Sequence, residues 1–323
     1  MVEINVLHLH RELLFVMTSI ILRTLKWVAA VLLVCGLSFS CQPVNTIPEP
    51  VVTGEVEVSD FSATRGDMHI GGKAYMPKGL NVKKPALICC HGLFGSYKDM
   101  EAYAHAPAKI GIASFCFDFC GGSADGSLSD GEALDNTILT QIEDLAAVYD
   151  AVSGRNDIDR SQIIVMGASQ GGLVSALFAV QNPSQVKALG LLFPAFNLPD
   201  IVRTATEVLF ENTDNLPEYV GIPSLGITFG RKYILYAYDL YPLDMIGAYE
   251  GPVFILHGDK DLLVPLEYSE KAVKKYKDAN LVVLKGQDHM FKAGGPDKAI
   301  ELLENWYRQN LDAILGIGAK SSW

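Results

Sequence analysis

The chain has 323 residues, of which 49% are apolar, and a formal net charge of −11 at neutral pH. This length and apolar content are sufficient for one large domain with a substantial core. Because the charges are dispersed and form no basic stripe, nucleic acid is excluded as the expected partner, and the acidity is interpreted as a solubility feature.

The amino-terminal segment predicts a bacterial export signal. Arg23 and Lys26 precede an apolar run over residues 27–37, which is followed by Ser38-Phe39-Ser40-Cys41. The run is shorter than the about 20 residues that a membrane-spanning helix needs. The segment after it is similar to a lipoprotein cleavage site.

From this pattern we expect a leader over residues 1–40, a lipid anchor at Cys41 and a proline-rich tether over residues 41–54. Such a protein would be exported to the bacterial periplasm or outer membrane and held there by its lipid. Ser38 and Phe39 depart from the preferred cleavage pattern, so an ordinary secretion signal or an uncleaved anchor stays open as an alternative. Met17 is a second candidate start of the leader.

Residues 55–323 are predicted to form one α/β domain. Residues 55–76 alternate in short β-like pieces, which indicates an antiparallel hairpin at the edge of a sheet. Beyond Pro85, short apolar strands alternate with amphipathic helices, a pattern that predicts a doubly wound, mostly parallel sheet. The strands are expected near residues 86–91, 113–119, 162–167, 187–193, 252–257 and 280–284. The helices are expected near residues 98–110, 133–153, 170–181, 266–277 and 296–313.

A long segment between Pro194 and Gly251 interrupts this alternation and is too long for an ordinary connection. We expect a cap inserted over about residues 195–250, between the sixth and seventh core strands. The segment is rich in tyrosine and phenylalanine, and Tyr233 and Tyr236 are its candidate substrate-binding residues. The alternative is that its aromatic side chains only pack the cap onto the domain.

The pentapeptide Gly167-Ala168-Ser169-Gln170-Gly171 lies between an expected strand and an expected helix. A serine between two glycines at such a turn is the nucleophile elbow of α/β-hydrolases. The glycines are needed because the turn is sharp and leaves no room for a side chain. Ser169 is therefore the candidate nucleophile.

Candidate partners for Ser169 follow two later strands. Asp261 comes after the strand near 252–257, and His289 comes after the strand near 280–284. The chain order Ser, Asp, His is that of the α/β-hydrolase triad. Because the carboxyl ends of parallel strands share one edge of the sheet, we expect the three side chains to meet there.

Backbone amides of Leu93 and Gln170 are the candidate oxyanion donors, since they follow the strand near 86–91 and the nucleophile, respectively. Other residues at the strand ends compete with the triad: His91 and His257 as bases, Asp259 as the acid and Asp288 beside His289. We interpret the two histidines as structural and Asp288 as a solvent-facing or capping residue.

Four cysteines lie on or next to expected core strands: Cys89, Cys90, Cys116 and Cys120. Their first interpretation is as small buried apolar residues. In an oxidising compartment a disulfide between neighbouring strands is an alternative, and the sequence assigns no pair. No metal site and no organic cofactor are expected.

Residues from about 60 to 310 resemble the bacterial cinnamoyl (feruloyl) esterases of the α/β-hydrolase superfamily. The matching motifs are residues 91–95, 117–126, 167–172, 257–261 and 286–289, and the cap is similar in size and placement. The sequence departs from the family pattern at Leu93, Gly122 and Ala124. The resemblance implies a carboxylic-ester hydrolase whose cap contacts the phenolic end of a hydroxycinnamate.

The predicted activity is therefore that of a serine esterase that forms an acyl-enzyme, acting on hydroxycinnamoyl esters of a small molecule or a saccharide. A generic short-chain acyl esterase and an acyl-peptidase are alternatives of the same chemical class. A membrane-tethered binding protein with an inactive hydrolase pocket is the alternative from a different class.

Overall fold

The computed structural model describes residues 55–79, 83–123, 126–222, 227–292 and 294–309. The leader, the Cys41 anchor and the tether predicted for residues 1–54 lie outside these ranges. None of the helices within the described residues is long and apolar enough to cross a membrane.

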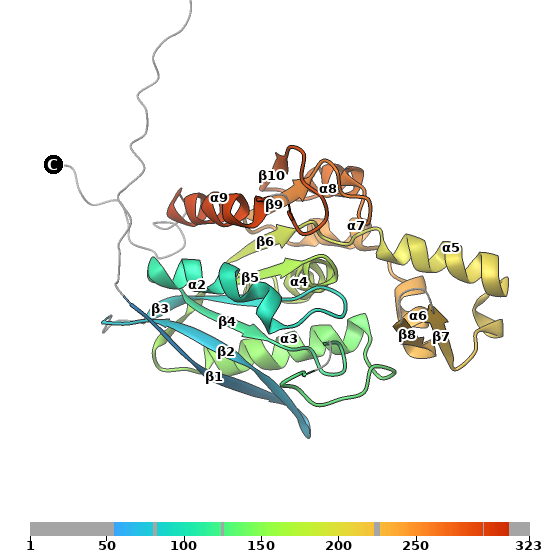
Figure 1. Cartoon of the computed structure of the whole chain (residues 1–323), viewed down its shortest axis with the longest axis horizontal. Helices are drawn as coiled ribbons and strands as arrows, with labels where there is room; N and C mark the ends of the chain where they lie inside the picture. The colour runs from blue at the N-terminus through green and yellow to red at the C-terminus, as the bar shows by residue number, and fades with distance from the viewer. Residues whose placement is uncertain (1–54, 80–82, 124–125, 223–226, 293, 310–323) are drawn as a thin grey trace, which may run out of the picture. The chain divides into compact units, whose positions relative to one another are not determined.

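Eight strands form one sheet in the order β1-β2-β4-β3-β5-β6-β9-β10 (Figure 1). Its edge is the predicted hairpin, in which β1 (Val56–Arg65) pairs antiparallel with β2 (Met68–Pro77). Strand β2 also pairs antiparallel with β4, whereas the remaining pairs in the sheet are parallel. The predicted doubly wound, mostly parallel sheet is confirmed.

The strands that follow the hairpin in the main sheet are mainly apolar where both faces of the sheet are covered, although residues 159–162 are polar. They are β3 (Lys84–Cys90), β4 (Ala113–Phe117), β5 (Ile158–Ala168), β6 (Ala188–Leu192), β9 (Val253–Gly258) and β10 (Ala279–Leu284). Successive side chains point to opposite faces, so Ile88 and its neighbour Leu87 belong to two different hydrophobic clusters.

Helices cover the two faces of the sheet. The cluster that contains Ile88 includes side chains of α3 (Ile138–Ser153), α4 (Gln170–Gln181) and α8 (Leu266–Val273). The cluster that contains Leu87 includes side chains of α2 (Glu101–Lys109), which follows the short helix η2 (Tyr97–Met100), and of α9 (Gly295–Gln309).

Helix α3 begins at residue 138, later than the predicted 133, because Thr137 caps it. The Thr137 hydroxyl accepts a hydrogen bond from the Thr140 amide at 3.0 Å, while residues 133–135 form a turn. Helix α8 ends at Val273 instead of continuing to the predicted residue 277. Turns and bends over residues 274–278 connect it to β10.

The cap lies between β6 and β9, the sixth and seventh strands of the main sheet along the chain. It contains a second, two-stranded sheet of β7 (Tyr219–Ile222) and β8 (Ile227–Gly230) that the sequence did not predict. Its helices are α5 (Leu198–Phe210), η3 (Thr213–Asn215), α6 (Arg231–Tyr238), α7 (Pro242–Met245) and η5 (Ile246–Ala248). Helix α5 extends beyond the carboxyl ends of the parallel strands, with α6, β7 and β8 beside it (Figure 1).

Candidate active site

Ser169 lies at the turn between β5 and α4, with a positive φ of 53°. Few residues other than glycine adopt this conformation, so the turn holds Ser169 in a strained geometry. The neighbouring glycines leave no room for a side chain: a Cβ atom on Gly167 would overlap the Gly171 carbonyl, and one on Gly171 would overlap the His91 carbonyl. These contacts are the close approaches that the elbow motif predicts.

Three side chains from separate loops form a hydrogen-bond chain. The His289 Nε2 atom lies 3.1 Å from the Ser169 hydroxyl oxygen, and His289 Nδ1 lies 2.7 Å from Asp261 Oδ2. The loops follow β5, β9 and β10, whose carboxyl ends lie at one edge of the sheet. In the tautomer that satisfies both contacts, Nδ1–H donates to the carboxylate and Nε2 accepts from the serine.

The Asp261 side chain is buried and is held by further hydrogen bonds. Its Oδ1 atom accepts from the Leu263 and Val264 amides, both at 2.9 Å, and its Oδ2 atom lies 3.2 Å from His257 Nε2. Burial tends to raise the pKa of the Asp261 carboxyl, but the hydrogen bonds from the two histidines and the backbone outweigh it and lower the pKa well below the ordinary value. The carboxylate is therefore ionised at neutral pH.

The His289 ring packs on an aromatic side chain. Its centroid lies 4.5 Å from that of Phe193, which in turn packs edge-on against Phe291 at 4.9 Å. Phe193, Met290 and Phe291 all have a positive φ, so the backbone is locally strained directly after His289 and at the aromatic residue on which its ring packs. The packing leaves His289 half-buried and fixes the plane of its ring.

The predicted oxyanion loop, residues 91–95, follows β3 and runs beside Ser169. A Cβ atom on Gly92 would lie 3.3 Å from the Ser169 Cβ atom, so the residue directly before Leu93 lies in close contact with Ser169. Gln170, the other predicted donor, is the first residue of α4, where backbone amides point out of the helix and favour negative charge.

His91 holds the backbone of this loop in place through hydrogen bonds. It is buried, its Nδ1 atom lies 2.7 Å from the Gly92 carbonyl oxygen, and its Nε2 atom accepts from the Phe119 amide at 3.1 Å. Burial lowers the pKa of His91, so the ring is neutral and Nε2 can accept. The structural role predicted for His91 agrees with these contacts.

Asp118 is a supporting residue that the sequence reasoning did not single out. Its buried carboxylate accepts from the Tyr97 amide at 2.6 Å and from the Leu128 amide at 2.8 Å. The residue therefore ties the segment after the oxyanion loop to the segment after β4. Its position directly after an apolar strand was the available signal.

Among the other candidates, Asp259 and Asp288 lie outside the hydrogen-bond chain, whereas His257 contacts its Asp261 member. Asp259 accepts from the Gly286 amide at 2.5 Å, and Asp288 accepts from the Lys292 amide at 2.9 Å. His257 contacts Ser269 at 2.7 Å and supports Asp261. The interpretation of His257 as a buried hydrogen-bonding residue agrees with this position.

Among the described residues, neither tyrosine proposed to bind substrate is hydrogen-bonded to Ser169, Asp261 or His289. Tyr233 is buried, and its hydroxyl donates to the Gln170 side chain at 2.6 Å. Tyr236 is half-buried and packs near Glu143 of α3, whose charge raises the pKa of the tyrosine after the larger effect of burial. Both side chains therefore join the cap to the domain.

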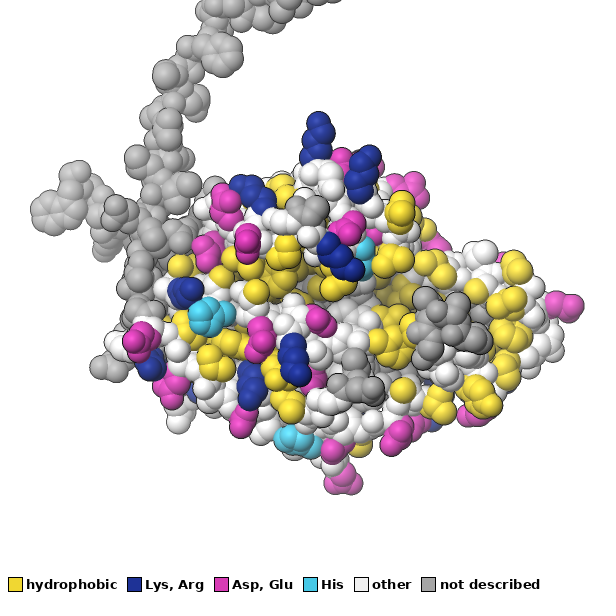
Figure 2. All heavy atoms as spheres, in the orientation of Figure 1, with side chains coloured by type: hydrophobic (Ala, Val, Ile, Leu, Met, Phe, Trp, Pro, Cys, Tyr) yellow, Lys and Arg dark blue, Asp and Glu magenta, His cyan; other side chains and the backbone are white. Residues whose placement is uncertain are grey.

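Exposed apolar side chains directly follow two of the candidate residues in the chain. Leu262 and Leu263 directly follow Asp261, and Met290 directly follows His289; their exposed fractions are 94%, 66% and 48%. Figure 2 shows apolar side chains gathered at the centre of this face and along the cap. The surroundings of the candidate site suit an apolar or aromatic substrate group.

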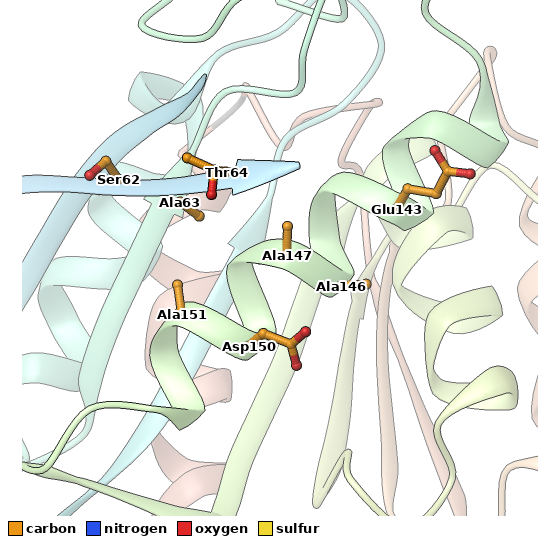
Figure 3. A pocket seen from close by; sticks show the side chains of 8 residues that line it. All are labelled: Ser62, Ala63, Thr64, Glu143, Ala146, Ala147, Asp150 and Ala151. Atoms are coloured by element: carbon orange, nitrogen blue, oxygen red, sulfur yellow. The ribbon is translucent and has the colours of Figure 1, made fainter. Parts of the chain in front are cut away.

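A different hollow lies on the surface between β1 and α3 (Figure 3). It is lined by Ser62, Ala63, Thr64, Glu143, Ala146, Ala147, Asp150 and Ala151. Its ionisable residues are two carboxylates from one helix, and it contains none of the residues of the hydrogen-bond chain.

The cysteines Cys89, Cys90, Cys116 and Cys120 are buried and free. Cys89 and Cys116 lie opposite each other in the pairing of β3 with β4. Within the described ranges, no group of three or more His, Cys, Asp or Glu side chains is arranged to hold a metal ion.

Sequence comparisons find a hydrolase family and a thioesterase among the proteins similar to this chain. A model of the family described as serine aminopeptidase, S33, matches residues 82–221, a region that includes Ser169. An uncharacterised protein of Mycobacterium tuberculosis is 26% identical over 228 residues, which are 70% of this chain and 70% of that protein. The mitochondrial palmitoyl-protein thioesterase ABHD10 of Mus musculus is 26% identical over 234 residues, covering 67% of this chain and 72% of the thioesterase.

A solved structure is also similar over most of its length. Est1E from Butyrivibrio proteoclasticus, with ferulic acid bound, aligns with a TM-score of 0.70 and 27% identity. The alignment covers 78% of this chain and 99% of Est1E.

Proposed function

Since this chain belongs to the α/β-hydrolase superfamily, we propose that it is a serine carboxylic-ester hydrolase that works through an acyl-enzyme. The observation that carries the proposal is the hydrogen-bond chain from Ser169 through His289 to Asp261. A serine hydroxyl is a poor nucleophile at neutral pH, and this chain supplies the base that it needs.

In the first half of the reaction the Ser169 oxygen attacks the ester carbonyl carbon while His289 Nε2 accepts the hydroxyl proton. Asp261 stabilises the imidazolium that forms, and the amides of Leu93 and Gln170 donate to the carbonyl oxygen as it becomes negative. Collapse of the tetrahedral intermediate breaks the bond to the alcohol, which takes the proton from His289. The acyl group is then bound to Ser169.

In the second half a water molecule attacks the acyl-enzyme while His289 accepts its proton. The second tetrahedral intermediate collapses, the proton returns to the Ser169 oxygen, and the carboxylic acid leaves. The same residues serve both halves of the reaction.

We propose that the preferred substrates are hydroxycinnamoyl (feruloyl-type) esters of a small molecule or a saccharide. The similarity to Est1E, whose structure contains ferulic acid, supports this substrate class. An aromatic contact at the site agrees with it: Phe94 of the oxyanion loop packs against Phe229 of the cap, with ring centroids 5.9 Å apart.

The family model described as a serine aminopeptidase supports an acyl-peptidase as the second candidate. The mechanism would be the same, with an amine in place of the alcohol as the leaving group. Hydrolysis of acyl-amino-acid anilides in preference to methyl esters would distinguish this candidate.

We also propose that the protein is an exported lipoprotein anchored at Cys41, in the periplasm or at the outer membrane. The basic residues, the apolar run and the cysteine that follows it support this localisation. Metabolic labelling with a palmitate analogue, in the wild type and in Cys41→Ser, tests it: labelling of both or of neither would contradict the proposal.

The substrate proposal predicts a preference for the aromatic acyl group. With methanol as the common leaving group, methyl ferulate is expected to give a kcat/KM about tenfold or more above that of methyl butyrate, since apolar contacts to the acyl group are worth about 1–3 kcal/mol. The measurement is the initial rate of acid release for each ester, with Ser169→Ala as the blank. A preference for the butyrate would assign the enzyme to the generic short-chain esterases.

A further inference from the structure

A line of buried polar side chains connects the cap to the nucleophile elbow. The Tyr233 hydroxyl of α6 donates to Gln170 Oε1 at 2.6 Å, and Gln170 Nε2 donates to Gln141 Oε1 of α3 at 2.8 Å. Gln141 Nε2 in turn donates to Asn136 Oδ1 at 3.1 Å. Gln170, which follows Ser169, thus joins α6 of the cap to α3, although these segments are distant in the sequence.

The direction of these hydrogen bonds is the same along the whole line. Burial raises the pKa of Tyr233 well above its ordinary value, so its hydroxyl is protonated and acts as the donor. Each amide then accepts with its oxygen and donates with its nitrogen, which uses both ends of Gln170 and of Gln141. The exposed fractions of Tyr233, Gln170 and Gln141 are 2%, 1% and 1%, so water does not replace a lost partner easily.

Gln170 has two functions in this arrangement. Its backbone amide is a proposed oxyanion donor at the first position of α4, and its side chain is held between the cap on one side and α3 on the other. Oxyanion stabilisation depends on donors that are already in place when charge develops. Fixing the side chain of Gln170 restricts the backbone that carries this donor.

The line also depends on close packing around Gly122. A Cβ atom at this position would lie 2.9 Å from Gln141 Nε2 and 3.2 Å from Asn136 Oδ1. The absence of a side chain on Gly122 therefore leaves room for the end of the line, at a position where the sequence departs from the esterase pattern.

We propose that Tyr233 is a positioning residue that acts through the side chain of Gln170. Through this hydrogen bond, the position of the cap affects the position of the backbone amide that donates to the oxyanion. The inference rests on the proposed serine-esterase function. It assigns Tyr233 to the elbow instead of the substrate, because its hydroxyl is already bound to Gln170.

The test compares Tyr233→Phe, Gln170→Met and the double variant with the wild type, using methyl ferulate and 4-nitrophenyl butyrate. Each single variant removes hydrogen bonds and keeps the length or shape of the side chain. We expect kcat to fall about tenfold in each single variant with KM changed less than about twofold, since a small displacement of a reacting geometry lowers turnover more than binding. The double variant should be no slower than Gln170→Met, because Tyr233 acts only through Gln170.

Tyr249→Phe is the matched control. Tyr249 is also fully buried, and its hydroxyl donates to the Val186 carbonyl at 3.1 Å, away from the elbow. Its kcat should stay within about twofold of the wild type. Circular dichroism and thermal unfolding of every variant show whether a loss of kcat accompanies a loss of fold, and Gln170→Met tests the coupling on its own if Tyr233→Phe does not fold.

The outcomes distinguish a failure of the proposed esterase function from a failure of the positioning role of Tyr233. A wild type that hydrolyses neither ester would overturn the proposed function and this inference with it. An active wild type with Tyr233→Phe as fast as Tyr249→Phe, or with losses that multiply in the double variant, would overturn only the positioning role.

Discussion

Replacing Ser169 with alanine is expected to lower kcat on methyl ferulate by a factor on the order of a million. The variant lacks the oxygen that forms the acyl-enzyme, while the site around it remains intact. The residual rate would come from the oxyanion donors and from binding. The measurement is steady-state hydrolysis at high enzyme concentration, with product quantified by chromatography.

Ser161→Ala is the control for this substitution. Ser161 lies on the same strand, β5, but its hydroxyl is exposed and bonds only to Asp159 at 2.7 Å among the described residues. This variant should keep the wild-type rate. A Ser169→Ala enzyme that retained a tenth of the activity would exclude Ser169 as the nucleophile.

Replacing Asp261 with asparagine is expected to lower kcat by about 10⁴-fold. The amide is nearly the same shape and can still accept from the Leu263 and Val264 amides. It carries no charge to stabilise the imidazolium, and its NH₂ group favours the wrong tautomer of His289. The loss should appear in kcat, with little change in KM.

The same substitution changes the acid sensitivity of the fold. Since the pKa of Asp261 is lower in the folded protein than its ordinary value, the ionised carboxylate contributes stability above that ordinary value, near pH 4, and the contribution is lost as the pH falls through the lowered pKa. Denaturant unfolding of the wild type and Asp261→Asn should therefore differ most at neutral pH.

Asp259→Asn distinguishes between the two aspartates of this loop. Asp259 is exposed and bonds to the Gly286 amide, so its replacement should change kcat by less than about threefold. If Asp259→Asn instead were the more damaging change, the acid of the hydrogen-bond chain would have been assigned to the wrong residue.

Much of the fold follows from local sequence signals. Buried parallel strands such as β6 are short apolar runs, and the glycines on either side of Ser169 indicate a turn that few other residues allow. The beginning of α3 was placed too early because the capping role of Thr137 is not visible in the hydrophobic pattern. The strands of the cap were missed, since β7 and β8 are short and are formed by pairing with each other.

The candidate site likewise has features that the sequence predicts and features that it does not. The positions of Ser169, Asp261 and His289 were predictable because each follows a strand of a parallel sheet, and such ends share one edge. The contacts of Asp118 and Tyr233 were not, because they join segments that are far apart in the chain. A buried hydrogen bond between remote side chains leaves no periodic signal, so only the structure reveals it.

The proposed esterase reaction depends on the activation of Ser169 as a nucleophile. Its most direct test is labelling of the purified protein with a fluorophosphonate, followed by peptide mass spectrometry, since this reagent phosphonylates a serine that a neighbouring base has activated. We expect one adduct on the peptide that contains Ser169, and none in Ser169→Ala. A wild-type protein that remained unlabelled, or that carried the adduct on a different serine, would contradict it.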